Sequence, residues 1–418
     1  MKQIEHAKNK LNSTLQLVTR LKDNDYPHDH VADVLDHFQA HLQERVDAVE
    51  DLDPALHVSV VNARCIEALA SVAEVFPILG YLNRSTNVNN PFELHGPFFR
   101  LFKKALGENA KLIIFPEWEY SPFTYEVPDE LHPQNIVLIG VPASESENGL
   151  VIPLAGHELG HCIWSKSEYQ EKYNAKLQDK VPEFIIDEKW KEFSEEFDLS
   201  AKNDLYDDMF GSECWTSIWE WACAQCEELF CDFVGLLMFR ESYLHAFAYF
   251  VSPGLSGNRS SLYPELLDRV NALEIVACKY GIDVPDGYAN QFENFSPTTD
   301  SMKRLMLEVS DGVTQSEILC LAQDANEFIQ STGIDAYSAE EVDRLVENFS
   351  LGVPAIKNPI GLSTIVNAAW KFSNDEISSW DKTYPMLKDD PIRKKRMLSD
   401  LIFKSIEVLE TYELNAAL

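Results

Sequence analysis

The spacing of apolar residues changes once along the chain, and this change constrains the fold most. Most of the 418 residues carry the three-to-four-residue spacing of amphipathic helices. One region instead contains three short runs rich in β-branched and aromatic residues, at 111–116, 123–127 and 135–142. Gly, Pro, Asn and Asp separate these runs, as in loops between strands. The sequence therefore predicts a mainly α-helical protein with one small β-sheet, an α+β fold.

Helical spacing before the sheet predicts three helices. The first precedes Pro27, the second contains residues 31–42, and the third covers 55–76 and is more apolar. Pro77 is expected to end or kink the third helix, because proline removes a backbone donor. After residue 150 the pattern predicts helices only.

The charge of the chain excludes several classes of partner. The sequence has 35 Lys and Arg against 68 Asp and Glu, a net charge of −33. Such a surface repels nucleic acid and anionic membranes. No secretion signal follows the N-terminus, and no apolar run approaches the roughly 20 residues that span a bilayer. We therefore expect a cytoplasmic protein that binds neither nucleic acid nor a membrane, with its 8 cysteines reduced.

The sequence His157-Glu158-Leu159-Gly160-His161 points to metal chemistry. Positions i and i+4 of a helix share a face, so both imidazoles can reach one ion. Glu158 lies close enough to act as a general base on a metal-bound water. A catalytic zinc ion also needs a third protein ligand from elsewhere in the chain.

Two Glu-x-x-x-Asp pairs could supply that third ligand. Glu183 and Asp187 lie in a mixed-charge amphipathic segment, where carboxylates are well solvated. Glu228 and Asp232 lie in an apolar segment, and no Lys or Arg occurs between 215 and 239. Burying a carboxylate without a counter-charge is costly, and a metal ion supplies that charge. The sequence therefore favours Glu228 as the ligand.

Residues around Glu228 add detail to this hypothesis. Asp232 lies one helical turn further on and can accept the outer N–H of His157. Glu227 competes with Glu228 as a ligand, but the residue four positions after it is a cysteine. Arg269 could bind an active-site carboxylate in a bidentate pair, or it could lie on the surface.

The motif at 157–161 followed by Glu228-Leu229-Phe230-Cys231-Asp232 resembles the gluzincins, the thermolysin-like zinc metallopeptidases, and their helix-rich bacterial members. The resemblance covers about residues 110–240. It implies one zinc ion held by His157, His161 and Glu228, with Glu158 as the base. The segment between the motifs, 165–212, would form an insertion over the cleft. Metzincins are excluded because Trp164 and Ser167 replace their glycine and histidine.

The family also uses a Tyr or His to stabilise the oxyanion that forms during hydrolysis. By position, the candidates in this chain are Tyr243, His245 and Tyr263, and each could instead be a packing residue. A separate group of histidines, His28, His30, His37 and His41, has no Glu or Cys context that defines a site. We expect these four side chains to lie on the solvated surface.

The change of pattern near residue 110 and a candidate linker rich in Pro, Gly and Asn at 283–300 divide the chain into three expected regions. They are an N-terminal helical region at 1–105, a zincin-like catalytic domain at 106–285 and a C-terminal helical region at 286–418. The expected function is zinc-dependent hydrolysis of a peptide or protein substrate, with an edge strand of the sheet binding the extended peptide. Two alternatives stay open: a zincin-fold interaction protein without turnover, and a helical adaptor in which the motif is coincidental. Zinc content would distinguish the adaptor from the other two.

Overall fold

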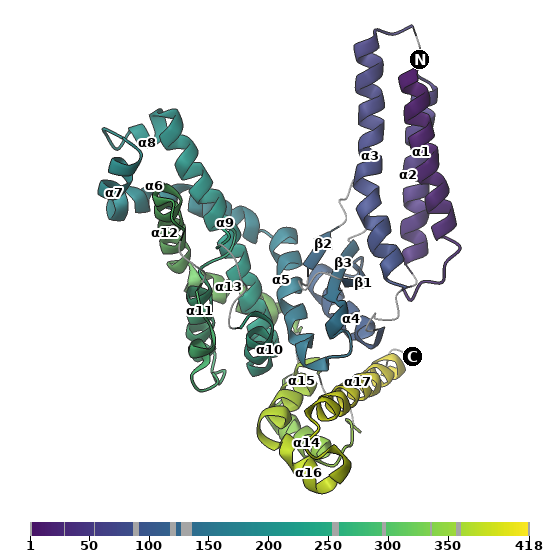
Figure 1. Ribbon diagram of the computed structural model, residues 1–418, viewed down its shortest axis with the longest axis vertical. Helices are drawn as coiled ribbons and strands as arrows, with labels where there is room; N and C mark the ends of the chain where they lie inside the picture. Colours follow the sequence, from purple (N-terminus) through teal and green to yellow (C-terminus); the bar gives the residue numbers. More distant parts are fainter. Residues whose placement is uncertain are drawn as a thin grey trace. The chain divides into compact units, whose positions relative to one another are not determined.

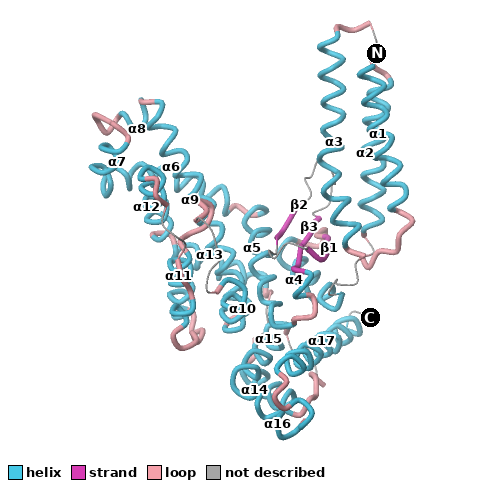
Figure 2. The backbone as a smooth tube through the Cα atoms, viewed as in Figure 1, coloured by secondary structure: helices cyan, strands magenta, loops and turns pink. Residues whose placement is uncertain are grey.

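The computed structural model describes residues 2–28, 30–53, 55–86, 92–117, 123–126, 136–252, 259–294, 298–334, 337–356 and 361–416. The chain forms two compact units, Met1–Glu147 and Asn148–Leu418. Figures 1 and 2 show that helices dominate both units and that the strands belong to the first. The prediction of a mainly helical protein with one small sheet is confirmed.

The first unit begins with the three predicted helices, α1 (Lys2–Leu21), α2 (Val31–Glu50) and α3 (Val58–Arg84). They pack side by side around a shared apolar core (Figure 1). The prediction that α3 ends or kinks at Pro77 is wrong about its end, because the helix continues to Arg84. Apolar side chains on both sides of Pro77, including Val75 and Ile78, are fully buried. Their packing offsets the backbone hydrogen bond that proline removes.

The three predicted strands form one sheet in this unit, although positions 127 and 135 lie outside the described residues. They are β1 (Lys111–Glu117), β2 (Phe123–Glu126) and β3 (Ile136–Pro142). The strand order is β1-β3-β2, with β1 parallel and β2 antiparallel to β3. Helices α3 and α4 (His95–Leu106) pack against β1. The apolar side chains of the sheet thereby join the core of the helical bundle.

Two of the histidines expected on the surface are buried beneath this sheet. His28 and His30 are 2% and 6% exposed, which corrects that expectation. The His28 ring lies 4.1 Å from that of His95 and 6.1 Å from that of His30. Two β1 carbonyl oxygens hold the cluster, because Nε2 of His28 is 3.2 Å from Ile114 O and Nε2 of His95 is 3.1 Å from Leu112 O. Backbone carbonyl oxygens thus bind one nitrogen each of His28 and His95, where the sequence pattern suggested water.

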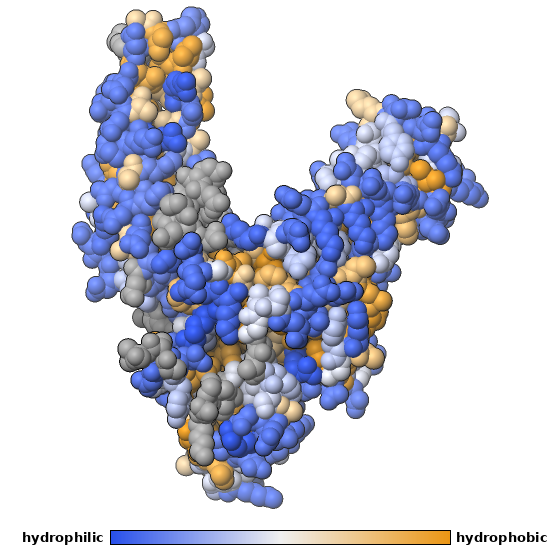
Figure 3. Space-filling model, turned by 180° about the vertical axis from the view of Figure 1, so that it is seen from behind, coloured by the Kyte–Doolittle hydropathy of each residue, from blue (hydrophilic) through white to orange (hydrophobic). Residues whose placement is uncertain are grey.

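Among the described helices, α3 alone is long and apolar enough to cross a membrane, by length and composition only. Its most apolar 18-residue stretch has a mean hydropathy of 1.6 and is 39% buried. This differs from the expectation that no apolar run approaches that length. Exposed apolar side chains also gather at the end of the bundle where α3 begins (Figure 3), including Leu56, Val58 and Val60. Core helices of soluble proteins have the same composition, so the cellular location stays an expectation.

The second unit is built around α9 (Met209–Phe239), the longest of its described helices. Helix α5 (Ala155–Lys166), which carries the metal motif, packs against α9. The other α-helices are α6 (Tyr169–Phe184), α7 (Trp190–Glu196), α8 (Asp204–Asp207), α10 (Glu241–Val251), α11 (Leu266–Lys279), α12 (Ser301–Gln315), α13 (Ile318–Thr332), α14 (Ala339–Ser350), α15 (Leu362–Lys371), α16 (Trp380–Thr383) and α17 (Pro391–Ala416). As predicted, the described residues of this unit contain no strand.

Two glycines of α5 bring its backbone close to α9. A methyl group on Gly160 would lie 2.5 Å from the Cα of Cys231, and one on Gly156 would lie 2.8 Å from the Cα of Gly235. Any larger side chain would push the helices apart. These two contacts also show that α5 and α9 run antiparallel. The close approach places the histidines of α5 beside the carboxylates of α9.

The segment 165–212, expected to form an insertion over the cleft, forms α6, α7 and α8 and includes the start of α9, and its position relative to a cleft stays a prediction. Its helices pack on α12 and along α9, where contacts extend as far as Phe230 (Figure 1). Trp219 Nε1 of α9 donates to Asn174 O at 3.0 Å, and Lys172 of α6 forms an ion pair with Asp324 of α13. The segment therefore packs against α9 and against α12 and α13, which themselves pack on α9.

The two units do not share borders with the three regions suggested by the sequence. The border at 147/148 falls inside the expected catalytic domain at 106–285, and separates the sheet from the metal motif. Helices α12 and α13 of the expected C-terminal region pack directly on α9. The extents of the three regions stay a prediction.

Candidate metal centre

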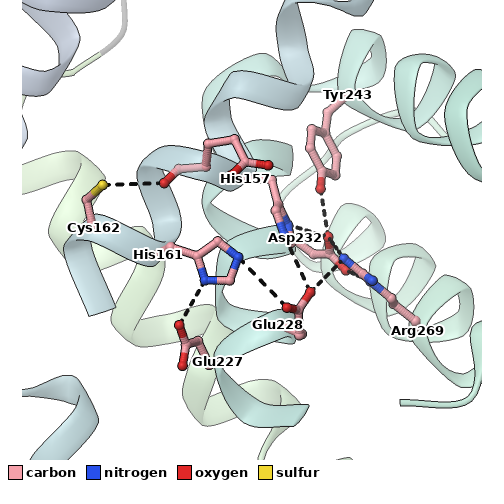
Figure 4. A network of polar contacts seen from close by, with 9 residues as sticks. His157, His161, Cys162, Glu227, Glu228, Asp232, Tyr243 and Arg269 are labelled. Carbon is pink, nitrogen blue, oxygen red and sulfur yellow. Dashed lines mark hydrogen bonds and ion pairs between the residues drawn. The ribbon is translucent and has the colours of Figure 1, made fainter. Parts of the chain in front are cut away.

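Helices α5 and α9 bring three potential metal ligands together (Figure 4). His157 and His161 lie one turn apart on α5, and Glu228 faces them from α9. One ligand atom from each of these residues lies within 4.8 Å of the others. The structure therefore gathers the three residues that the sequence selected, although they come from helices far apart in the chain.

Carboxylates bind the outer nitrogen of each histidine. His157 Nδ1 is 3.0 Å from Asp232 Oδ1, and His161 Nδ1 is 2.8 Å from Glu227 Oε1. Because each Nδ1–H donates to a carboxylate, each Nε2 is left to bind a metal. Both Nε2 atoms face Glu228, at 3.4 Å for His157 and 3.8 Å for His161.

These separations, the shorter of which is 3.4 Å, are close to those around a single tetrahedral ion. Bonds of about 2.0–2.1 Å place two ligands of such an ion about 3.3–3.4 Å apart. Glu228 is 8% exposed, and its Oε2 atom forms ion pairs with His157 Nε2 at 3.4 Å and Arg269 Nη2 at 3.3 Å but no hydrogen bond. Two imidazoles and one carboxylate are also the donor set of catalytic zinc sites, which keep a fourth position open. The cluster could thus hold one zinc ion.

Asp232 is the centre of the polar network behind His157. Its side chain is fully buried and accepts a hydrogen bond from Tyr243 Oη at 2.7 Å. Arg269 forms a bidentate pair with it, with Nη2 at 2.8 Å from Oδ1 and Nε against Oδ2. This is the carboxylate pairing considered for Arg269 from the sequence. Burial would raise the pKa of Asp232, but Arg269 and His157 hold it well below its usual range.

The same charges act on the two neighbouring ligands. Burial opposes a charge on His157, but Asp232 and Glu228 outweigh it and raise its pKa to about 10. Burial likewise acts to raise the pKa of Glu228, while His157 and Arg269 lower it overall. Without a metal, the imidazole therefore holds a proton between two carboxylates. A metal ion at Nε2 would take the place of that proton.

The structure separates the three candidates for oxyanion stabilisation. Tyr243 is 1% exposed and its hydroxyl is engaged by Asp232, so it supports the network from behind. His245 lies elsewhere, with its ring stacked 5.1 Å from Trp370 and its Nε2 3.2 Å from Asn374 Nδ2. Both side chains thus have protein partners, and an oxyanion role for either stays a prediction.

Tyr263 remains beside the site. Its side chain is 43% exposed, and the centre of its ring lies 5.7 Å from the guanidinium carbon of Arg269. The negative charge of Glu228, more than burial, raises the pKa of Tyr263, and Glu158 acts in the same direction. Glu158 itself is 4% exposed on α5. The charges of a metal ligand and of the expected base therefore both act on the Tyr263 hydroxyl.

Sequence reasoning weighed Glu227 only as a ligand and missed its contact with His161. The signal was present in the antiparallel packing of the two helices. Asp232 faces His157, so the residue facing His161, one turn later on α5, must lie about one turn earlier on α9. Glu227 is that residue, and its side chain is 31% exposed.

Comparison of the chain with models of known protein families, with curated proteins and with solved structures finds no match. The chemistry assigned to this centre therefore rests on the sequence motif and on the geometry described above.

Proposed function

We propose that this protein is a zinc-dependent metallopeptidase that hydrolyses peptide bonds in a peptide or protein substrate, with a zincin-like core and a cytoplasmic location. One observation carries the proposal. The Nε2 atoms of His157 and His161 converge on the Glu228 carboxylate, while other carboxylates hold both Nδ1 atoms. This arrangement orients two neutral imidazoles toward a single cation and balances its charge.

The roles of the residues follow from their positions. A zinc ion bound here would supply Lewis acidity to a water molecule and to the substrate carbonyl. Glu158 accepts a proton from the attacking water and passes it to the leaving nitrogen. Tyr263 donates a hydrogen bond to the oxyanion that develops on the carbonyl. Asp232 and Glu227 keep the two imidazoles in the tautomer that binds the metal.

The decisive experiment replaces Glu158 with Gln. This change keeps the size of the side chain and removes the base, so zinc content should stay at one ion per chain. Hydrolysis of an unbiased peptide library should fall by roughly 10²–10⁴-fold. Equal cleavage by wild type and Glu158→Gln would show that Glu158 is not the base.

A matched pair of variants tests the third ligand. Glu228→Gln should lose zinc and activity, whereas Glu183→Gln, at an exposed position in the other Glu-x-x-x-Asp pair, should keep both. A zinc-loaded wild type that cleaves no peptide would instead favour an interaction protein without turnover. A wild type that binds no zinc would favour a helical adaptor.

A further inference from the structure

Tyr263 belongs to a short loop, residues 259–263, that precedes α11 and borders the candidate metal centre. Arg269 connects this loop to the ligands, because its guanidinium lies over the Tyr263 ring while Nη2 is 3.3 Å from Glu228 Oε2. Phe247 lies 5.2 Å from the same guanidinium carbon. Tyr263 is thus a half-exposed side chain whose distance from the ligands depends on how its loop is held.

One largely buried ion pair ties this loop to α12. Arg259 Nη1 is 2.7 Å from Asp311 Oδ2, and Nη2 binds Oδ1 of the same carboxylate. The Arg259 and Asp311 side chains are only 11% and 13% exposed. Arg259 Nη2 also donates to the carbonyl oxygen of Tyr263 at 3.4 Å. A bidentate pair fixes the orientation of the Arg259 guanidinium as well as its distance from Asp311. The hydrogen bond from this guanidinium to the Tyr263 carbonyl oxygen therefore restricts the backbone of Tyr263 directly.

A second buried contact ties the loop to α9. Gln225 is fully buried one turn before Glu228, and its Nε2 donates to the carbonyl oxygen of Ser261 at 3.4 Å. Its Oε1 accepts a hydrogen bond from Thr314 Oγ1 of α12 at 3.1 Å. The loop is therefore anchored to the helix that carries the metal ligand and to α12, which lies about 80 residues further along the chain from that ligand.

We propose that the Arg259–Asp311 pair is a positioning device that holds Tyr263 beside the metal centre, so that α12 sets the placement of a side chain that faces the substrate. Arg259 and Asp311 are positioning residues, since they act through Tyr263. The catalytic consequence rests on the proposed peptidase function, whereas the structural consequence, the placement of Tyr263, can be measured without it.

A double-variant experiment tests the catalytic consequence in the full-length, zinc-loaded protein. Tyr263→Phe should lower kcat by about 10²-fold, as for loss of an oxyanion donor. Asp311→Asn should lower kcat by about tenfold through misplacement, with KM within about threefold and zinc content unchanged. The combined variant should be no slower than Tyr263→Phe alone. Effects that multiply would show that Asp311 acts independently of Tyr263 and would overturn the proposal.

Glu308→Gln is the matched control, because it removes a carboxylate from the same helix. Glu308 is paired with Lys189 at 3.0 Å and is 49% exposed, so kcat should be unchanged. Arg259→Lys supplies a second variant if Asp311→Asn folds poorly. It keeps the charge but removes the bidentate geometry, and kcat should fall in the same direction. A wild-type kcat for Arg259→Lys would contradict the proposal.

Fluorine NMR measures the placement of Tyr263 independently of activity, with 3-fluorotyrosine at position 263 alone and cobalt(II) at the metal centre. The paramagnetic ion should shift and broaden the Tyr263 signal, and Asp311→Asn should reduce this shift while Glu308→Gln leaves it unchanged. An unaltered signal in Asp311→Asn would overturn the proposal. Failure to cleave any peptide would count against the peptidase function only. If cobalt does not bind, the metal-free signal provides the same comparison between variants.

Discussion

Each of the two units contains a cluster of histidines, and the clusters differ in what surrounds them. In the first unit, the Nε2 atoms of His28 and His95 meet backbone carbonyl oxygens of β1. Burial, reinforced by His95, lowers the pKa of His28 to about 3. In the second unit, carboxylates meet His157 and His161 on both sides of their rings, and the pKa of His157 is raised to about 10.

This difference shows why proximity of histidines does not by itself make a metal site. A carbonyl oxygen satisfies an N–H but carries no net charge to balance a cation. Carboxylates both orient the imidazoles and compensate the charge of the ion. Among the described residues, the ligand atoms of His157, His161 and Glu228 lie within 4.8 Å of one another, and the first cluster forms no such group of three.

The largest contrast is expected in zinc content. His157→Ala should lose the zinc ion, because two ligands of an open site remain, whereas His28→Ala should keep one zinc per chain and only lose stability. Elemental analysis of both purified variants, with circular dichroism to verify their fold, measures this difference. Equal loss of zinc in the two variants would show that the two histidine clusters do not differ in metal binding.

The first cluster should make folding sensitive to acid. The pKa of His28 is lower in the folded state, about 3, than its ordinary value of 6.5, so the unfolded chain binds the proton first. Its stabilising effect is complete above pH 6.5 and is lost as the pH falls from 6.5 toward 3. Across this range the free energy of unfolding should fall by up to about 1.4 kcal/mol per pH unit.

Denaturant unfolding of the full chain between pH 7 and 4 measures this dependence. The free energy of unfolding of wild type should fall more steeply than that of His28→Asn, which keeps a donor for the Ile114 carbonyl. His37→Asn is the control, because His37 is a half-buried residue of α2. Its free energy of unfolding should depend on pH as that of wild type does. Identical slopes for wild type and His28→Asn would exclude a buried neutral His28.

Removing the charge behind His157 should weaken zinc binding by about 10–100-fold. Asp232→Asn keeps the shape of the side chain but loses the anion that orients the imidazole. A competition assay with a fluorescent chelator measures the affinity. Because Arg269 would also lose its counter-charge, thermal unfolding of the metal-free variant must be recorded beside it. Unchanged affinity would show that Asp232 only neutralises Arg269.

A smaller effect is expected behind His161. Glu227→Gln should weaken zinc by up to about tenfold, because Glu227 is 31% exposed and water can replace its hydrogen bond. The same chelator assay compares it directly with Asp232→Asn. A loss larger than that of Asp232→Asn would reverse the assigned ranking of the two carboxylates.

Local spacing along the chain was sufficient to predict the three N-terminal helices, the three strands and the shared face of His157 and His161. These features depend on the period of a single element, which is 3.6 residues for a helix and 2 for a strand. The preference for Glu228 over Glu183 also came from the sequence, because the absence of basic residues around Glu228 is a local property.

The tertiary structure decided which side chains meet. Gly160 and Cys231 are far apart in the chain, and their close approach selects Glu227 as the partner of His161. Packing places Tyr243 behind Asp232 and turns His245 toward Trp370, a choice that position alone left open. Spacing within one helix determines a face, but the neighbour of that face depends on steric fit between distant segments, which local sequence patterns do not contain.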